Sequence, residues 1–242
     1  MARASSGKIL PVKLLALESS SDLFTTALFL DGHIVEREGA RGVPHSEIAL
    51  PLVRGLFAEA GVALGELHGI AFGAGPGAFT GLRLACSVAQ GLAVGAGGLP
   101  VIGIGSLEAL ALGAGEGAVY ACTDARMNEI YCAAYHVHGE TVDTAVAPVV
   151  TAPAQAPLPP GEGWLGCGSG FAAHGAALAD RLGTSVGRID AAARPRAADL
   201  LRLAAPRFAR GEGLDAALAA PLYVRDKVAL TTRERLAAGG KA

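Results

Sequence analysis

A repeated arrangement of three short strands constrains the fold of this chain more than any other feature. Residues 13–38 read as an apolar strand, an acidic turn, a long strand, an X-Gly turn and a third strand, and residues 118–146 repeat that order. In the first copy 14 residues separate Glu18 from the turn glycine, and in the second 15 residues separate Asp124 from its counterpart. The matched spacing favours an internal duplication, which predicts two related units that each begin with an antiparallel meander.

The composition narrows the classes of protein further. The 242 residues carry 20 lysines and arginines against 22 aspartates and glutamates, and 51% of the side chains are hydrophobic. Many apolar side chains with so little net charge exclude intrinsic disorder, and the 34 glycines show no period of three, which excludes collagen. A chain without a strong positive field does not capture nucleic acid by itself, so any role on a nucleic acid requires a partner.

The longest uncharged stretch, residues 84–107, is long enough for a membrane span but contains a glutamine, a proline and several glycines. We interpret it as a buried helix over 84–95, a Gly-rich turn over 96–99 and a buried strand over 100–104. The N-terminus lacks the long apolar segment of a signal peptide. We therefore expect a cytoplasmic protein with no membrane segment. The cysteines are widely spaced and are expected to be buried free thiols: Cys86, Cys122, Cys132 and Cys167.

Helical and extended segments alternate between and after the two meanders. Ile48, Leu52 and Leu56 recur at helical spacing, and Gly61 is expected to end that helix as its C-cap. Ser106 is expected to be the N-cap of a later helix. We therefore expect helices that pack closely on sheets. The helices are predicted at about 44–61, 79–94, 106–112, 171–182 and 195–210, additional strands at 67–72, 100–104 and 164–170, and a proline-rich connection at 147–163.

The most distinctive segment is the glycine loop GAGPGAFTG at residues 73–81. It is predicted to be a strand-to-helix turn, and the free N–H groups of a helix start could hold a phosphate. No Gly-Lys-Ser/Thr follows, as a Walker loop requires, and the spacing does not fit the dinucleotide fingerprint. Composition favours a plainer interpretation, in which the glycines let the helix pack tightly on the strand. The loop residues of interest are Gly75, Pro76, Gly77, Thr80, Gly81 and Arg83.

The duplicated meander is similar to the start of each domain in actin-like ATPases, where an acidic residue at the first hairpin lies near phosphate or metal. Glu18 and Asp124 take that place here, and a later glycine loop near the adenosine would correspond to Gly166, Gly168 and Gly170. The second hairpin lacks the glycines whose N–H groups cradle phosphates, so we regard these as degenerate nucleotide-site positions. An independent actin-like small-molecule kinase or ATPase stays open as an alternative function.

Longer segments resemble the bacterial TsaB (YeaZ) family. The resemblance covers nearly the whole chain after residue 13 and implies an α/β, actin-like (ribonuclease H-like) fold. It implies two duplicated βββαβα-type domains at 13–105 and 106–225, a flexible extension at 1–12 and a mobile tail at 226–242. A helix near 196–210 is expected to pack back on the N-terminal domain. The matching segments are LLALESS (14–20), PHSEIALPLV (44–53), GIAFGAGPGAFTGLRLACSVAQGLA (69–93), PVIGIGSLEALA (100–111), TDARMNEIYCAAY (123–135) and APLYVRDKVAL (220–230).

The resemblance implies a noncatalytic subunit of the machinery that forms N6-threonylcarbamoyladenosine in tRNAs reading codons that start with A. Its partners would be a TsaD-like catalytic subunit and a TsaE-like ATPase. It would meet tRNA only indirectly, with ATP and a metal on the partner subunits and no cofactor bound by this chain alone. In the TsaD pattern two metal-binding histidines follow the strand after the glycine-loop helix, and those positions are Ser106 and Leu110 here. Neither side chain replaces an imidazole as a metal ligand.

In this family two helices of the N-terminal domain pair with the same helices of a partner. The partner is a second copy when TsaD is absent, or TsaD itself. The helices correspond to residues 45–60 and 79–94, where Gly81, Ala85 and Gly91 would permit close approach. Periodicity alone favours ordinary core packing for the same positions. The implied interface residues are His45, Ile48, Leu52, Leu84 and Val88.

Overall fold

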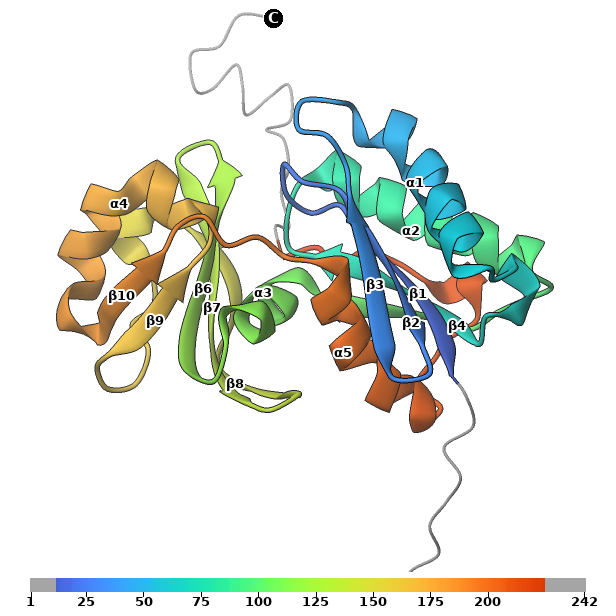
Figure 1. Ribbon diagram of the computed structural model, residues 1–242. Coiled ribbons are helices and arrows are strands. Elements are labelled where there is room, and N and C mark those ends of the chain that lie inside the picture. Colours follow the sequence, from blue (N-terminus) through green and yellow to red (C-terminus); the bar gives the residue numbers. More distant parts are fainter. Residues whose placement is uncertain (1–11, 225–242) are drawn as a thin grey trace, which may run out of the picture.

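The computed structural model describes residues 12–224, which form two five-stranded sheets with α-helices packed against them (Figure 1). The N-terminal sheet has the strand order β3-β2-β1-β4-β5, and the C-terminal sheet has the order β10-β9-β6-β7-β8. The strands of the N-terminal sheet are β1 (Lys13–Glu18), β2 (Thr25–Leu30), β3 (His33–Glu38), β4 (Gly69–Gly75) and β5 (Val101–Gly105). Those of the C-terminal sheet are β6 (Gly117–Arg126), β7 (Glu129–His138), β8 (Thr141–Thr151), β9 (Trp164–Cys167) and β10 (Val186–Asp190).

The two sheets share one topology, which confirms the predicted duplication and the α/β fold. In each sheet the first three strands form an antiparallel meander. A fourth strand then pairs parallel with the first, and a fifth pairs parallel with the fourth. The copies differ in one connection: an α-helix leads from β3 to β4, whereas only the short 3-10 helix Pro153–Gln155 lies between β8 and β9.

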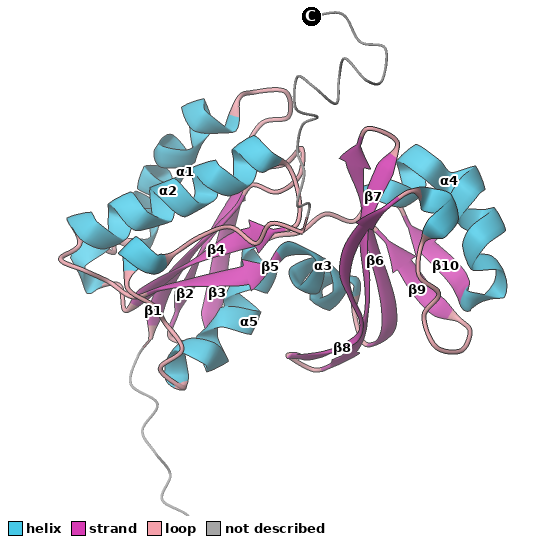
Figure 2. Ribbon diagram, turned by 180° about the vertical axis from the view of Figure 1, so that it is seen from behind, coloured by secondary structure: helices cyan, strands magenta, loops and turns pink. Residues whose placement is uncertain are grey.

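The helices and sheets form layers (Figures 1 and 2). Helices α1 (His45–Ala60) and α2 (Phe79–Gly95) cover the outer face of the N-terminal sheet, and α4 (Ser169–Leu182) covers the outer face of the C-terminal sheet. Helices α3 (Ser106–Ala114) and α5 (Ala197–Ala209) lie between the two sheets. Because α5 packs against β1, β2 and β4, the chain returns to its N-terminal half near its end.

Both faces of β1 are buried, which explains its continuous apolar sequence. Leu14 and Ala16 point to the central core shared with α3 and α5, whereas Leu15 and Leu17 point to the outer core under α1 and α2. Strand β6 alternates in the same way between the central core and the core under α4. Each such leucine stabilises the fold by about 1.5–3 kcal/mol relative to an exposed position.

Two local predictions are confirmed by backbone geometry. Asp31 and Gly32 both have positive φ, as a two-residue hairpin turn with this sequence requires. Gly61 caps α1 in the left-handed conformation, with φ of 63°. The four cysteines are also buried and free, as predicted. Burial raises the pKa of each of these thiols, which disfavours the reactive thiolate.

Three local predictions are wrong. Strand β8 continues to Thr151 through the supposed proline-rich connection, because β8 is an edge strand, where Pro148 removes no essential ladder bond. Strand β10, VGRID, was not expected, since its edge position leaves it polar and mostly exposed. Ser106 is the first residue of α3, not its N-cap, and its hydroxyl bonds elsewhere.

The stretch at 84–107 is divided as expected, because α2 ends at Gly95 and β5 starts at Val101. Within residues 12–224 no helix has the length and apolar character needed to cross a membrane. The expected N-terminal extension, except for residue 12, and the expected tail at 226–242 lie outside the described residues.

Candidate functional site

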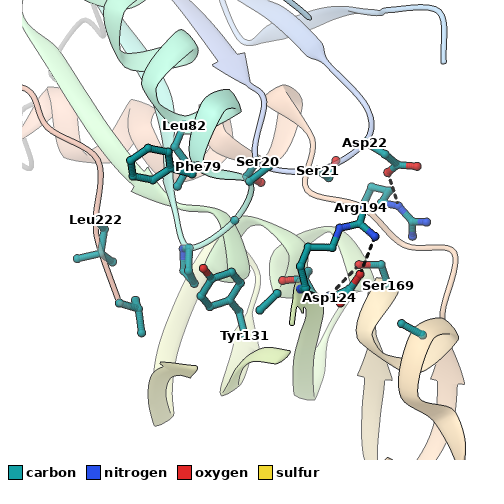
Figure 3. Close-up of a pocket in the computed structure, with 18 of the residues that line it drawn as sticks. Ser20, Ser21, Asp22, Phe79, Leu82, Asp124, Tyr131, Ser169, Arg194 and Leu222 are labelled. Carbon is teal, nitrogen blue, oxygen red and sulfur yellow. Dashed lines mark hydrogen bonds and ion pairs between the residues drawn. The ribbon is translucent and has the colours of Figure 1, made fainter. Parts of the chain in front are cut away.

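A cavity of about 590 Å³ lies between the two halves of the molecule, where the first hairpins of both sheets approach each other (Figure 3). The N-terminal half contributes the β1–β2 turn and the loop from β4 into α2. The C-terminal half contributes the β6–β7 hairpin and the start of α4. Among residues 12–224, the charged residues that line it are two aspartates and two arginines: Asp22, Asp124, Arg126 and Arg194.

One ion pair, between Asp22 and Arg194, joins the two halves at this cavity (Figure 3). Arg194, in the linker between β10 and α5, donates from Nε to Asp22 Oδ1 at 2.9 Å. Arg41 Nη1 lies 3.7 Å from the other carboxylate oxygen. Burial works to raise the pKa of Asp22, but the hydrogen bond and charge of Arg194 outweigh it and lower that pKa. Asp22 is therefore held as a carboxylate.

The second pair lies at the β6–β7 hairpin. Asp124 Oδ1 accepts from the backbone N–H of Arg126 at 2.9 Å, and Oδ2 lies 3.1 Å from Arg126 Nη1. Ser169 Oγ accepts from the Asp124 N–H at 3.1 Å, which ties the hairpin to the start of α4. The turn itself places three consecutive non-glycine residues at positive φ, Arg126, Met127 and Asn128, a conformation that costs free energy.

The other side of the cavity is apolar (Figure 3). Phe79 and Leu82 of α2 and Leu222 form this wall. Residues 214–224, here called the C-terminal strap, contact both β4 and α2: the Leu222 N–H donates to Ala74 O of β4 at 2.7 Å, and Gln90 Nε2 of α2 donates to Ala216 O at 2.9 Å. The strap therefore completes the cavity from the end of the described chain.

Arg83 fixes the rim of this apolar wall. Its guanidinium carbon lies 3.9 Å from the Phe79 ring centroid, and its Nε donates to Tyr223 Oη at 3.1 Å. The Phe79 and Tyr223 rings lie 5.8 Å apart. Arg83 thus joins α2 to the strap through a cation–π contact and a hydrogen bond.

One buried polar atom at the cavity has no partner among residues 12–224. Thr123 is 9% exposed and lines the cavity, and its buried Oγ1 makes no hydrogen bond within that part of the chain. His174 Nε2 is also without a hydrogen bond, although it lies 3.5 Å from Asp124 Oδ1 and would form an ion pair there when protonated. Buried polar atoms are almost always satisfied, so an unpaired hydroxyl at a cavity needs an explanation.

Glu18 and Asp124 were expected at equivalent positions of the two hairpins, but they lie in different environments. Asp124 lines the cavity, whereas Glu18 is fully buried behind it. Glu18 accepts from the Ser20 N–H at 2.5 Å and from Ser106 Oγ at 3.1 Å. Burial raises the pKa of Glu18, although hydrogen bonds from Ser20, Ser106 and Ser19 work to lower it. Glu18 therefore connects β1 to α3 and does not face the cavity.

The shifted pKa of Glu18 predicts a pH effect on stability. Because the folded pKa lies above the usual 4.5, the folded state binds the proton more strongly than the unfolded chain. Folding stability should then fall as pH rises from about 4.5 through the folded pKa. In Glu18→Gln this contribution is absent, so the variant should gain stability relative to wild type over that range. Urea unfolding of both proteins at several pH values measures the difference; a relative gain by wild type would contradict the assignment.

The glycines of the predicted nucleotide loop serve packing. A Cβ at Gly170 would overlap Cys122 Sγ, one at Gly168 would overlap Cys122 O, and one at Gly166 would lie 2.7 Å from Phe171. All three positions let α4 and β9 approach their neighbours closely, and none of them lines the cavity.

The glycine loop at residues 73–81 supports both interpretations, because some of its residues line the cavity and others permit close packing. Pro76 and Gly77 line the cavity, and Gly75 ends β4 at a positive φ of 110°. A Cβ at Gly77 would press on Ser20, and one at Gly81 would overlap Ser19 O, so both glycines permit close packing of α2 on the β1–β2 turn. Thr80 is exposed on the first turn of α2.

The predicted interface residues lie on α1 and α2 and are half-buried. Ile48, Leu52 and Val88 pack at the margin of the outer core. His45 opens α1, with Nδ1 2.8 Å from Ser19 Oγ and its ring 5.7 Å from that of Phe24. Leu84 is also half-buried.

The prediction is wrong for two of the small residues expected to permit close approach at that interface. Gly81 and Ala85 are buried inside this chain. Gly91 has open space where a Cβ would lie, as does Gly55 on α1. Packing within residues 12–224 therefore gives no steric reason for either of these two glycines.

Sequence reasoning missed Asp22, Arg194, Ser169 and the strap. Asp22 was visible as the acidic end of the β1–β2 turn cluster, and Ser169 as the polar residue between the packing glycines. Arg194 gave no signal, because its role depends on a linker that follows the unexpected β10. The strap lacks any periodic pattern and is defined by its contacts with β4, β5 and α2.

Comparison with known proteins gives consistent matches. A family model described as tRNA N6-adenosine threonylcarbamoyltransferase, TsaD, matches residues 40–232. The Escherichia coli K12 protein named tRNA threonylcarbamoyladenosine biosynthesis protein TsaB is 33% identical over 231 residues, 90% of this chain and 96% of that protein. A Haemophilus influenzae protein of the same name is 40% identical over 122 residues, 49% of this chain and 51% of that protein. The solved YeaZ from Pseudomonas aeruginosa has a TM-score of 0.81 and 37% identity, covering 88% of this chain and 99% of that one.

The duplicated sheets and the cavity between their first hairpins define a two-domain α/β protein of the actin-like class. The YeaZ structure shares this architecture over nearly its whole length. The chain belongs to the TsaB (YeaZ) family, whose named relatives are tRNA threonylcarbamoyladenosine biosynthesis proteins.

Proposed function

We propose that this chain is a noncatalytic subunit that supports a TsaD-like catalytic subunit in forming N6-threonylcarbamoyladenosine in tRNA, together with a TsaE-like ATPase. The environment of Ser106 and Leu110, the positions of the two metal histidines in the TsaD pattern, carries this proposal. Ser106 donates its hydroxyl to Glu18, and Leu110 is buried in the central core. Both side chains are committed to internal contacts, and neither is a ligand of the kind a transition metal selects.

The cofactors follow from this assignment. ATP and the metal belong to the partner subunits, and this chain binds neither by itself. The net charge of −2 supports an indirect role on tRNA, since phosphate backbones are bound through an excess of lysine and arginine.

The partner surface proposed here is an apolar stripe on each of α1 and α2. Both stripes have the order apolar, apolar, glycine at positions i, i+4 and i+7, which lie on one face of a helix. A glycine inside a helix costs about 1 kcal/mol relative to alanine. Since no neighbour from the described part of the chain fills the space beside either glycine, close approach of another helix would explain them. The partner face consists of Ile48, Leu52 and Gly55 on α1 and Leu84, Val88 and Gly91 on α2.

The same face would serve a second copy of this chain when the catalytic subunit is absent. A homodimer and a heterodimer built on one face exclude each other, so added TsaD-like subunit should displace the homodimer. His45 lies at the start of α1, where its bond to Ser19 would hold this end of the face against the cavity turn.

Reconstitution tests the proposed function. With purified TsaD-like and TsaE-like partners, tRNA and the threonylcarbamoyl-adenylate, we expect modified tRNA only when this chain is present, and no product from this chain alone. Product from this chain alone, or full activity of the partners without it, would refute the proposal. Calorimetry with ATP addresses the kinase alternative, which the burial of Glu18 disfavours because only one of the two expected acids lines the cavity.

A further inference from the structure

We propose that the end of β7 carries a chelating site for a divalent transition metal of the zinc, nickel and copper class, with His136 and His138 as its two protein ligands. These residues lie at the opposite end of β7 from the cavity hairpin. The site is separate from Ser106 and Leu110, the positions of the catalytic metal in the TsaD pattern, and it does not rest on the proposed role in tRNA modification.

Strand geometry places both imidazoles on one face of the sheet, because residues i and i+2 of a strand point to the same side. The two rings stack, with their centroids 6.4 Å apart and their planes 10° from parallel. Two imidazoles on one tetrahedral zinc ion, with Zn–N bonds of about 2.0–2.1 Å, have centroids roughly 5 Å apart. A small rotation of His138, whose side chain is 65% exposed, therefore brings both rings onto one ion.

The residue type selects the class of ion. Neutral imidazole is a ligand for zinc, nickel and copper, whereas magnesium and calcium prefer oxygen ligands. Once one imidazole holds the ion, the second binds at a high effective concentration, because the strand already keeps it nearby. Within residues 12–224 no three histidine, cysteine or acidic side chains are grouped so that they could hold an ion together. The protein therefore supplies two ligands, and water completes the coordination.

Glu116, just before β6, supports His138. Its Oε1 lies 3.5 Å from His138 Nδ1, and its Oε2 accepts from the Gly139 N–H at 2.9 Å, which fixes the carboxylate at the β7–β8 turn. A carboxylate beside one ring nitrogen of a metal-binding histidine orients the ring and raises its basicity as a ligand. Glu116 thus faces Nδ1, and Nε2 is the nitrogen left for the ion.

His136 is positioned by its neighbours on β9 and β8. Its ring centroid lies 4.9 Å from that of Trp164, which is buried. Asp143 of β8 is directly opposite His136 in the register, and such cross-strand pairs share a face with Cβ atoms about 4.5–5.5 Å apart. Each histidine therefore has an acidic neighbour, and the two carboxylates offset the charge of a divalent ion.

Calorimetry with Zn²⁺ on the full, untagged chain tests the site. We expect one ion per chain, bound roughly tenfold or more weakly by either His136→Asn or His138→Asn, since each variant removes one of two ligands. Glu116→Gln should weaken binding by roughly tenfold, because it removes the carboxylate that orients His138. The matched control is His33→Asn, which changes an exposed histidine on the other sheet and should leave the affinity unchanged.

Two further measurements make the result decisive. The four cysteines are buried and do not compete for zinc in the folded chain, so each variant must keep the wild-type urea midpoint without metal. His138 is exposed, so His138→Asn remains informative even if the loss of the His136–Trp164 contact unfolds the other variant. An equal concentration of Mg²⁺ should not displace zinc. Absence of saturable zinc binding, unchanged affinity in folded His138→Asn, or displacement by Mg²⁺ would overturn the proposal.

Discussion

Gly81→Ala is expected to destabilise the protein by about 3 kcal/mol, although helix propensity alone favours alanine by about 1 kcal/mol. Gly81 lies in the first turn of α2, where a Cβ would overlap the carbonyl oxygen of Ser19. Relief requires a shift of backbone, since the obstructing atom is not the end of a flexible side chain. Helix α2 would have to move away from the β1–β2 turn, which opens the outer core and one wall of the cavity.

The matched control is Gly175→Ala in α4. Gly175 is exposed and begins the part of α4 that follows a kink at His174, and a Cβ there meets no neighbour among residues 12–224. This variant should be stabilised by up to about 1 kcal/mol through helix propensity alone. Urea unfolding of both variants measures the opposite signs. If Gly81→Ala also gained stability, the close approach of α2 to Ser19 would be wrong.

Val88→Glu should weaken binding of the TsaD-like partner by roughly a hundredfold or more. An unpaired charge buried in an interface costs about 3–5 kcal/mol, and Val88 lies in the middle of the α2 stripe of the partner face. Self-association through the same face should be lost in parallel. Analytical ultracentrifugation, with and without the partner, measures both affinities, and Leu52→Glu should have the same effect from α1.

Val94→Glu is the matched control, because it introduces the same charge on the same helix. Val94 is 68% exposed near the end of α2, so the same substitution there stays in water. Partner affinity should be unchanged in this variant. Val88 also touches the outer core, so Val88→Glu must retain a cooperative unfolding transition before its binding is interpreted. Unchanged affinity of a folded Val88→Glu would place the interface elsewhere.

The fold could be predicted wherever the sequence repeats or alternates. The paired meanders, the helices α1 and α2 and the Asp31-Gly32 turn carry local signals, and each is where the sequence places it. Helix α5 also lies close to its predicted bounds, but the sequence does not show that its first N–H groups are capped from another part of the chain. Ala197 N donates to Thr25 Oγ1 at 2.8 Å, and Ala198 N donates to Glu36 Oε1 at 3.0 Å.

The candidate site was predicted only in part, because residue type does not reveal which way a side chain faces. Glu18 and Asp124 occupy equivalent places in the two meanders, yet one is buried against Ser106 and the other lines the cavity. The glycines that suggested phosphate binding are explained by close packing. Arg194 and Leu222 reach the cavity from segments without periodicity, so only the folded chain shows their part in it.

The return of α5 to the N-terminal sheet has a consequence for how the protein is made. Leu14, Ala16 and Ala71 on the inner face of that sheet pack in the core that α5 completes. A ribosome has therefore synthesised most of the chain before the first sheet can bury both faces. The N-terminal half emerges early and closes late, so its apolar inner face is open to aggregation until α5 has been synthesised.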